Sequence, residues 1–164
     1  MLRTFADLGF RWKIALPILL LAALLVAILG ERDFLRLPPG QRDADLRHRV
    51  DIALSGKAPR QILEVARRLT QGKDADSSMT GALLALAYPD RVAQQRRPGG
   101  AEYRLANGRA ALFAEADSLM KQAWLVIADL GSRQGQREER IYLAAEFDPA
   151  LFGDVLAEQV RTVE

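Results

Sequence analysis

Arginine side chains cluster between residues 91 and 109, and this cluster is where the sequence points most clearly to chemistry. The stretch holds five arginines and one acid, Glu102, so its local net charge is +4. Arginines bind phosphates through ion pairs, and an aromatic ring among them can stack on a base. The candidate nucleic-acid-binding residues are Arg91, Arg96, Arg97, Tyr103, Arg104, Asn107 and Arg109. The alternatives are a solvated strand face for the arginines and a packing role for Tyr103.

Other patterns that could support catalysis or metal binding fail on their residue types. The chain has no cysteine and one histidine, His48, which lies between two arginines. Gly56-Lys57 and Gly72-Lys73 lack the upstream glycine and the following hydroxyl that a phosphate-binding loop requires. We therefore expect no catalytic residue, no metal site and no cofactor in this chain.

The elements that would position the arginines follow from changes in hydrophobic period. Asn107-Gly108 lies between two extended runs and predicts a type I′ turn, because both central positions of that turn need positive φ. Continuous apolar residues at 124–128 are typical of a strand in a closed barrel. The predicted strands cover residues 91–97, 103–106, 109–113, 124–130 and 140–147. Five short strands after a helical segment predict an OB-like barrel with the arginines on one edge.

Helical periodicity dominates the first half of the chain. The predicted helices cover residues 2–8, 12–29, 43–55, from 59 onwards and 79–87, with a closing helix after Asp148-Pro149. We expect Gly9 to end the first helix, Gly30 to provide a left-handed cap for the second and Gly56 to end the third. The fold class is thus α+β, with a helical bundle at 1–72, a linker at 73–78 and the barrel at 79–164.

The length and composition of the chain indicate how many domains it forms, and its charge indicates where it could bind nucleic acid. A chain of 164 residues with 49% hydrophobic and 27% charged residues suits one domain or two small ones. The net charge of +2 is uneven, because residues 1–77 carry +4 and residues 78–164 carry −2. Attraction to nucleic acid is therefore local to the arginine stretch rather than spread over the molecule.

An apolar run at Ile14–Gly30 has two interpretations. It holds 17 residues without a charge, which as a helix reach about 25 Å, short of a hydrocarbon core of roughly 30 Å. Basic residues both precede and follow it, so the positive-inside bias is weak. The run is either a buried helix of a bundle or a single membrane span.

Three segments in the second half of the chain form one set of motifs, Leu83–Arg91, Leu105–Arg109 and Trp124–Leu130, and four more lie upstream, Met1–Arg3, Ala6–Gly9, Leu21–Leu25 and Gly30–Arg36. Together these segments resemble the C-terminal region of the HrpB-type DEAH-box ATP-dependent helicases. Their order and spacing agree with the family, and the resemblance is looser between Pro38 and Lys73. Ile14–Ile18 is more apolar than the family pattern, and Pro17 lies where a helix should begin.

The resemblance implies an accessory module, not the motor. The family's ATP-binding loop, its Asp-Glu-Ala-His motif and its arginine finger have no counterpart here, so ATP and magnesium would belong to a motor. It implies single-stranded nucleic acid as a partner, RNA in preference to DNA, together with helicase motor domains in cis or in trans. It also implies a buried bundle helix at 14–30 and a cytoplasmic location. The alternatives are a single-pass inner-membrane protein with a C-terminal domain of unknown partner, and a structural remnant of a helicase.

Overall fold

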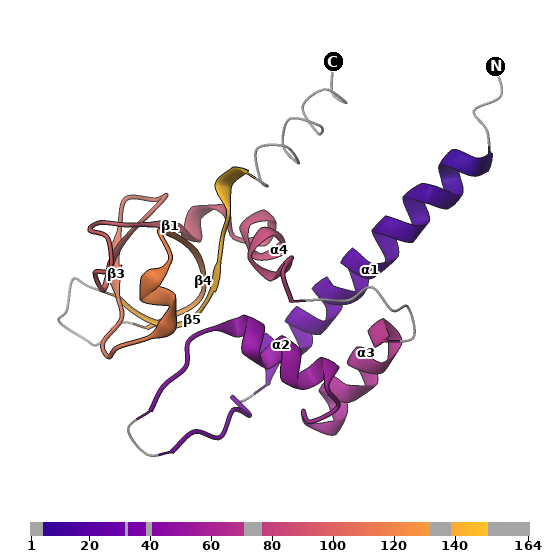
Figure 1. Ribbon diagram of the computed structural model, residues 1–164, viewed down its shortest axis with the longest axis horizontal. Coiled ribbons are helices and arrows are strands. Elements are labelled where there is room, and N and C mark those ends of the chain that lie inside the picture. Colours follow the sequence, from indigo (N-terminus) through magenta and orange to yellow (C-terminus); the bar gives the residue numbers. More distant parts are fainter. Residues whose placement is uncertain (1–4, 32, 39–40, 71–76, 132–138, 151–164) are drawn as a thin grey trace. The chain divides into compact units, whose positions relative to one another are not determined.

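The computed structural model describes residues 5–31, 33–38, 41–70, 77–131 and 139–150, with the side chains of 5–17 and 69–70 excepted. The chain forms two compact units, one of residues 1–36 and 47–79 and the other of residues 37–46 and 80–164. The elements in chain order are α1 (Phe5–Gly30), α2 (Leu46–Leu54), α3 (Arg60–Thr70), α4 (Thr80–Ala87), η1 (Pro89–Arg91), β1 (Val92–Gln95), β2 (Glu102–Leu105), β3 (Ala110–Leu112), η2 (Ser118–Lys121), β4 (Trp124–Gly131) and β5 (Glu139–Glu146). Figure 1 shows these elements as ribbons. The predicted α+β class, helices followed by a five-stranded barrel, is confirmed.

In the helical unit, α1 uses one face of the apolar run for packing. Leu21, Leu24, Leu25 and Ile28 are buried, and their spacing of three and four residues places them on one side of the helix. This helix contacts α3, whose Ile62 and Ala66 are buried. Leu19 and Val26, on the opposite side, are 62% and 72% exposed. Among the residues that the structure describes, no helix meets the length and hydropathy needed to cross a bilayer.

The predicted break at Gly9 is wrong, because α1 is continuous from Phe5 to Gly30. An isolated glycine costs about 1 kcal/mol relative to alanine inside a helix, which need not end it. Gly30 is also not in the left-handed conformation, since the described glycines with positive φ are Gly56, Gly99 and Gly108. The prediction for Gly56 is confirmed: its φ is 80°, and the amides of Gly56 and Lys57 bond to the carbonyls of Ala53 and Ile52. This pattern is a Schellman motif.

One partly buried ion pair joins α2 to Asp33, shortly after the end of α1. The guanidinium of Arg49, 2% exposed, donates two hydrogen bonds to the carboxylate of Asp33, at 3.0 and 2.6 Å. Partial burial acts to raise the pKa of Asp33, but hydrogen bonds from Arg49 and from the Leu35 amide hold it below its ordinary value. The paired charges allow an arginine to be almost fully buried.

The barrel is closed in the order β1-β2-β3-β5-β4. Neighbouring strands are antiparallel except β3 and β5, which are parallel and, within the described residues, pair at Ala111–Glu139 and Leu112–Arg140. Each predicted strand coincides with an observed one to within two residues. The interior is filled by small and branched side chains with two aromatic rings, Tyr103 and Phe113, in edge-to-face contact at 5.7 Å. Residues 151–164, which hold Leu151, Val155 and Leu156 of the predicted closing helix, and residues 73–76 of the predicted linker at 73–78 lie outside the described residues.

An extended segment that precedes α2 completes the barrel. Ala44 is buried in the barrel core, its carbonyl accepts a 2.9 Å hydrogen bond from the Ala144 amide of β5, and Asp45 lies opposite Ala144 in a parallel bridge. The Ala44 amide donates to the carboxylate of Asp117 at 2.8 Å. The compact unit that contains the barrel therefore includes residues 37–46, which the sequence assigns to the bundle.

Candidate nucleic-acid interface

The outer face of β1, β2 and β3 carries Arg104, the one arginine of the stretch 91–109 that lies within a strand. Arg104 pairs with Gln94 of β1 on one side and with Ala110 of β3 on the other. Directly paired residues point to the same face of a sheet, and Gln94 and Arg104 are both exposed. Their sequence neighbours Ala93, Tyr103 and Leu105 fill the interior. Arg104 thus projects outward, flanked by a short polar side chain and a methyl group.

Two further arginines lie in the loop between β1 and β2. Arg96 and Arg97 are both exposed, and Arg96 forms an ion pair with Glu102 at 3.7 Å. Among the described residues Arg97 and Arg104 have no acidic partner within 4.0 Å, unlike Arg96 and Arg109. These two guanidinium groups are the ones free to neutralise a phosphate.

The loop that carries Arg97 is held by the side chain of Gln95. Its amide nitrogen donates to the carbonyls of Gly100 and Met120 at 2.8 and 2.7 Å, and its oxygen accepts from the Gly99 amide at 3.2 Å. Gly99 has a φ of 72°, which favours glycine. The loop is therefore fixed by side-chain and backbone bonds before any ligand binds. The sequence analysis did not identify Gln95, because nothing in the local pattern shows that its amide turns inward.

Arg91 and Arg109 form bonds that hold the barrel itself. A guanidinium nitrogen of Arg91 donates to the carbonyl of Ala128 at 2.8 Å, and the same group lies 4.8 Å from the ring centroid of Tyr88. Arg109 bonds to Glu139 at 2.9 Å, between the start of β3 and the start of β5. These contacts position the strands and leave each arginine less available to a phosphate than Arg97 or Arg104.

Tyr103 is not on the surface. It is 0% exposed, and its hydroxyl lies within hydrogen-bond distance of the carbonyls of Leu119 and Gln122 and accepts from Gln95. Because the ring is enclosed by the barrel, the predicted stacking of Tyr103 on a base is wrong. The alternative of a packing residue is the one observed.

The predicted type I′ turn at Asn107-Gly108 is also wrong. The Gly108 amide donates to the Leu105 carbonyl, and the Leu105 amide donates to the Arg109 carbonyl, both at 2.9 Å. Ala106 and Asn107 are thus the central residues of the turn, and Gly108 follows with a φ of 86°. This is a three-residue loop in which the positive-φ residue forms a bulge. Asn107 is exposed, and its side-chain oxygen accepts from the Arg109 amide at 3.1 Å.

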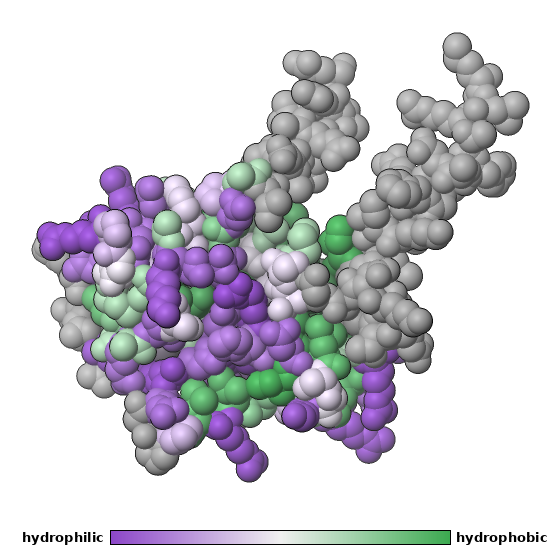
Figure 2. Space-filling view, in the orientation of Figure 1, coloured by the Kyte–Doolittle hydropathy of each residue, from purple (hydrophilic) through white to green (hydrophobic). Residues whose placement is uncertain are grey.

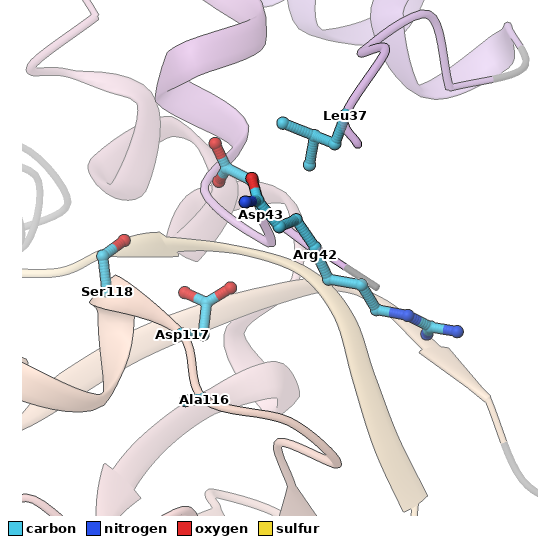
Figure 3. A pocket seen from close by; sticks show the side chains of 7 residues that line it. Leu37, Arg42, Asp43, Ala116, Asp117 and Ser118 are labelled. Atoms are coloured by element: carbon cyan, nitrogen blue, oxygen red, sulfur yellow. The ribbon is translucent and has the colours of Figure 1, made fainter. Parts of the chain in front are cut away.

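A hollow in the barrel unit lies where Leu37 and residues 41–43 meet residues 116–118. Figure 3 shows the side chains that line it, with the Asp117 carboxylate near the centre. Both oxygens of Asp117 are engaged, one by the Ala44 amide and the other by the Leu119 amide, and Arg42 pairs with Glu115 at 3.6 Å. Within the described part of the chain, no three potential metal ligands come together. This hollow is therefore a structural junction.

Comparison with known proteins shows similarity to one kind of helicase. The chain is 34% identical over 131 residues to the ATP-dependent RNA helicase HrpB of Escherichia coli K12, and the match covers 77% of this chain and 15% of that protein. The chain is similar to the C-terminal region of HrpB-type helicases. Two solved structures agree: the E. coli DExH-box NTPase HrpB (TM-score 0.59, 29% identity, 83% of this chain and 16% of that one) and the E. coli DEAH/RHA helicase HrpB (TM-score 0.56, 26% identity, 77% and 15%).

The match covers a small part of the HrpB proteins, and it helps to interpret the apolar run at 14–30. No family model matches the chain, and the chain spans about one sixth of the length of the HrpB proteins that it matches. The likeness to a helicase region confirms the resemblance that the sequence indicates. In that setting the buried face of α1 against α3 agrees with a helix of the predicted bundle.

Proposed function

We propose that this chain is an accessory module of an HrpB-like, ATP-dependent helicase and that it guides single-stranded nucleic acid over the outer face of β1–β3. The observation that carries the proposal is a pair of exposed guanidinium groups with no acidic partner among the described residues, that of Arg104 on this face and that of Arg97 in the adjoining loop between β1 and β2. Arg96 and Arg109 add positive charge that nearby acids partly neutralise. In a five-stranded barrel of this kind, the face of strands 2 and 3 and the loop between strands 1 and 2 bind oligonucleotides.

The surface chemistry supports a backbone contact more than a base-specific one. Figure 2 shows hydrophilic side chains over much of the barrel surface that it draws. Arginines that are not held by acids bind phosphates wherever the strand passes, whatever its sequence. We therefore expect sequence-tolerant binding, as a strand-guiding surface needs. Because the E. coli protein is named an RNA helicase, we propose RNA in preference to DNA.

The proposed partners in the assembly are helicase motor domains, in cis or in trans, which would bind ATP and magnesium. This part rests on the similarity to HrpB, of which the chain spans 15%. The module would add binding along the path of the strand and leave hydrolysis to the motor.

The test measures the salt dependence of binding. For single strands the slope of log K against log salt is about −0.7 for each phosphate neutralised. Replacing Arg97 and Arg104 together by glutamine should therefore weaken the binding of a fluorescently labelled oligouridine and make the slope shallower by about 1.4 units. Fluorescence anisotropy from 50 to 200 mM salt measures both quantities.

A matched variant controls for net charge. Lys57→Gln with Arg68→Gln removes the same two charges from exposed positions in the helical unit, and we expect the slope to stay unchanged. If the original chain binds no oligonucleotide, or if both double variants change the slope equally, the proposed surface is wrong. Parallel titrations with oligouridine and oligothymidine test the preference for RNA.

A further inference from the structure

The outer surface of the barrel is divided into a covered half and an open half. Val126 of β4 and Ala145 of β5 pair with each other and are fully buried, yet neither belongs to the interior cluster. The helix α4 contacts both strands, and its Leu84 and Ala85 are buried as well. This helix therefore covers β4 and β5 from outside, as Figure 1 shows. Gln94, Glu102 and Arg104, on the outer face of β1 and β2, are exposed.

Trp124 lies at the border between these two halves. It is the first residue of β4 and pairs with Gln94, which in turn pairs with Arg104. Its neighbour Leu125 points into the barrel, so Trp124 is on the outer face, two positions before the covered Val126. Unlike Val126 it is only partly buried. The register thus places Trp124, Gln94 and Arg104 in one row across the adjacent strands β4, β1 and β2. This row presents a partly exposed indole, a carboxamide and a guanidinium.

We propose that Trp124 stacks on an unpaired base of the single strand whose phosphates contact Arg104. This inference rests on the function proposed above and adds a base-contacting residue to a surface otherwise made of charges. Adjacent strands are about 4.8 Å apart, so Trp124 and Arg104 are separated by roughly 10 Å at their backbones, a span that one or two nucleotides cover. Gln94, between them, offers a donor and an acceptor to the edge of the stacked base.

Stacking on Trp124 favours single-stranded nucleic acid over a duplex. Stacking requires a base whose face is free, and the faces of bases inside a duplex are already occupied. It tolerates any sequence because every base has a π-face. The row therefore predicts binding of single-stranded RNA with little preference for sequence and weaker binding of duplex RNA of the same length.

A single-tryptophan protein reports directly on the proposed contact. The chain has two tryptophans, Trp12 and Trp124, so Trp12→Phe leaves Trp124 as the only indole. Titration of this protein with oligouridine should quench its emission along the same curve as the anisotropy of the labelled oligonucleotide. Binding with no change in tryptophan emission would overturn the stacking role and leave the proposed function intact. Absence of binding would overturn both.

Two substitutions separate stacking from packing. Trp124→Leu keeps an apolar side chain but removes the ring, and it should weaken oligouridine binding about 5- to 150-fold. Trp124→Phe keeps a ring and should stay within a few-fold of the original affinity. Neither change should alter the salt slope, because no charge is lost. If thermal unfolding shifts in both variants while both affinities stay unchanged, Trp124 only packs and the inference is wrong.

Discussion

A single buried hydroxyl, that of Tyr103, connects the strand β2 to the segment around η2. Its partners are the carbonyls of Leu119 and Gln122 and the side chain of Gln95, which also fixes the loop of Arg97. Burial raises the pKa of Tyr103 to about 12, and the charge of Asp117 acts in the same direction. The ring therefore supports the proposed binding surface from below without reaching it.

Tyr103→Phe tests this role. Loss of the hydroxyl removes the one O–H donor within reach of the carbonyls of Leu119 and Gln122, of which that of Leu119 also accepts from the Gln122 amide. The change should lower the free energy of unfolding by about 1–3 kcal/mol. The folded-state pKa lies above that of the unfolded chain, near 10, so the stability contribution is complete below pH 10 and falls as the pH rises towards 12. Urea denaturation at pH 7 and between pH 9 and 11 measures both effects. Tyr142→Phe, at an exposed position of β5, is the control and should retain the stability at pH 7 and the alkaline decline.

Residue types alone predict the arginine stretch but not the partners of its side chains. The sequence shows five arginines between 91 and 109, but not which of them are free. Arg109 is paired with Glu139, thirty residues away, and Arg91 with the carbonyl of Ala128. These partners come from strands that meet only when the barrel closes. Which arginines remain available to phosphate is thus a property of the topology.

At the scale of elements, alternation in the sequence predicts the strands well because each strand has one face in the barrel interior. The pattern of exposed and buried residues in β2 follows that alternation from Glu102 to Leu105. The turn after β2 is harder to predict, since Asn-Gly suits both a two-residue loop and the last two positions of a three-residue loop. The Trp124 row was missed for a related reason. A continuous apolar run does not show which half of the outer face a helix will cover.

The helix α4 depends on a glycine at its contact with β5. A Cβ atom at Gly81 would lie 1.8 Å from the backbone oxygen of Glu146, and a backbone atom in a paired strand cannot move aside easily. Gly81→Ala should therefore lower the free energy of unfolding by about 1–3 kcal/mol or more, despite the higher helix propensity of alanine. Thermal and urea unfolding measure the change.

Gly30→Ala is the control for Gly81→Ala. It lies at the end of α1, and a Cβ there meets nothing within 4 Å, so stability should stay equal or rise slightly. Equal stability of Gly81→Ala and the original chain would show that α4 does not sit as closely on β5 as described.

At the scale of the whole molecule, the order of residues along the chain does not match the division into compact units. Residues 37–46 lie between two helices in sequence, yet they belong with the barrel. Sequence reasoning could not find this, because a polar stretch with Pro38 and Gly40 has the composition of an ordinary connection. The reason is structural. Among the described residues β3 pairs with β5 at Glu139 and Arg140, and further along β5 it is Ala144 that bonds to Ala44 and lies opposite Asp45.

The contribution of this segment can be measured in the full chain. Ala44 is 5% exposed and part of the barrel core, so Ala44→Asp places a carboxylate in an apolar site without a counter-charge. An uncompensated buried charge costs about 3–5 kcal/mol, and the barrel should lose that much stability although the substitution lies outside all five strands. Gln41→Asp, at an exposed position of the same segment, controls for added negative charge. The emission of Trp124 in a Trp12→Phe background follows barrel unfolding in urea. If both variants unfold with the original midpoint, the segment rests on the barrel without stabilising it. A loss confined to Ala44→Asp means that burial of Ala44, outside the five strands, stabilises the barrel.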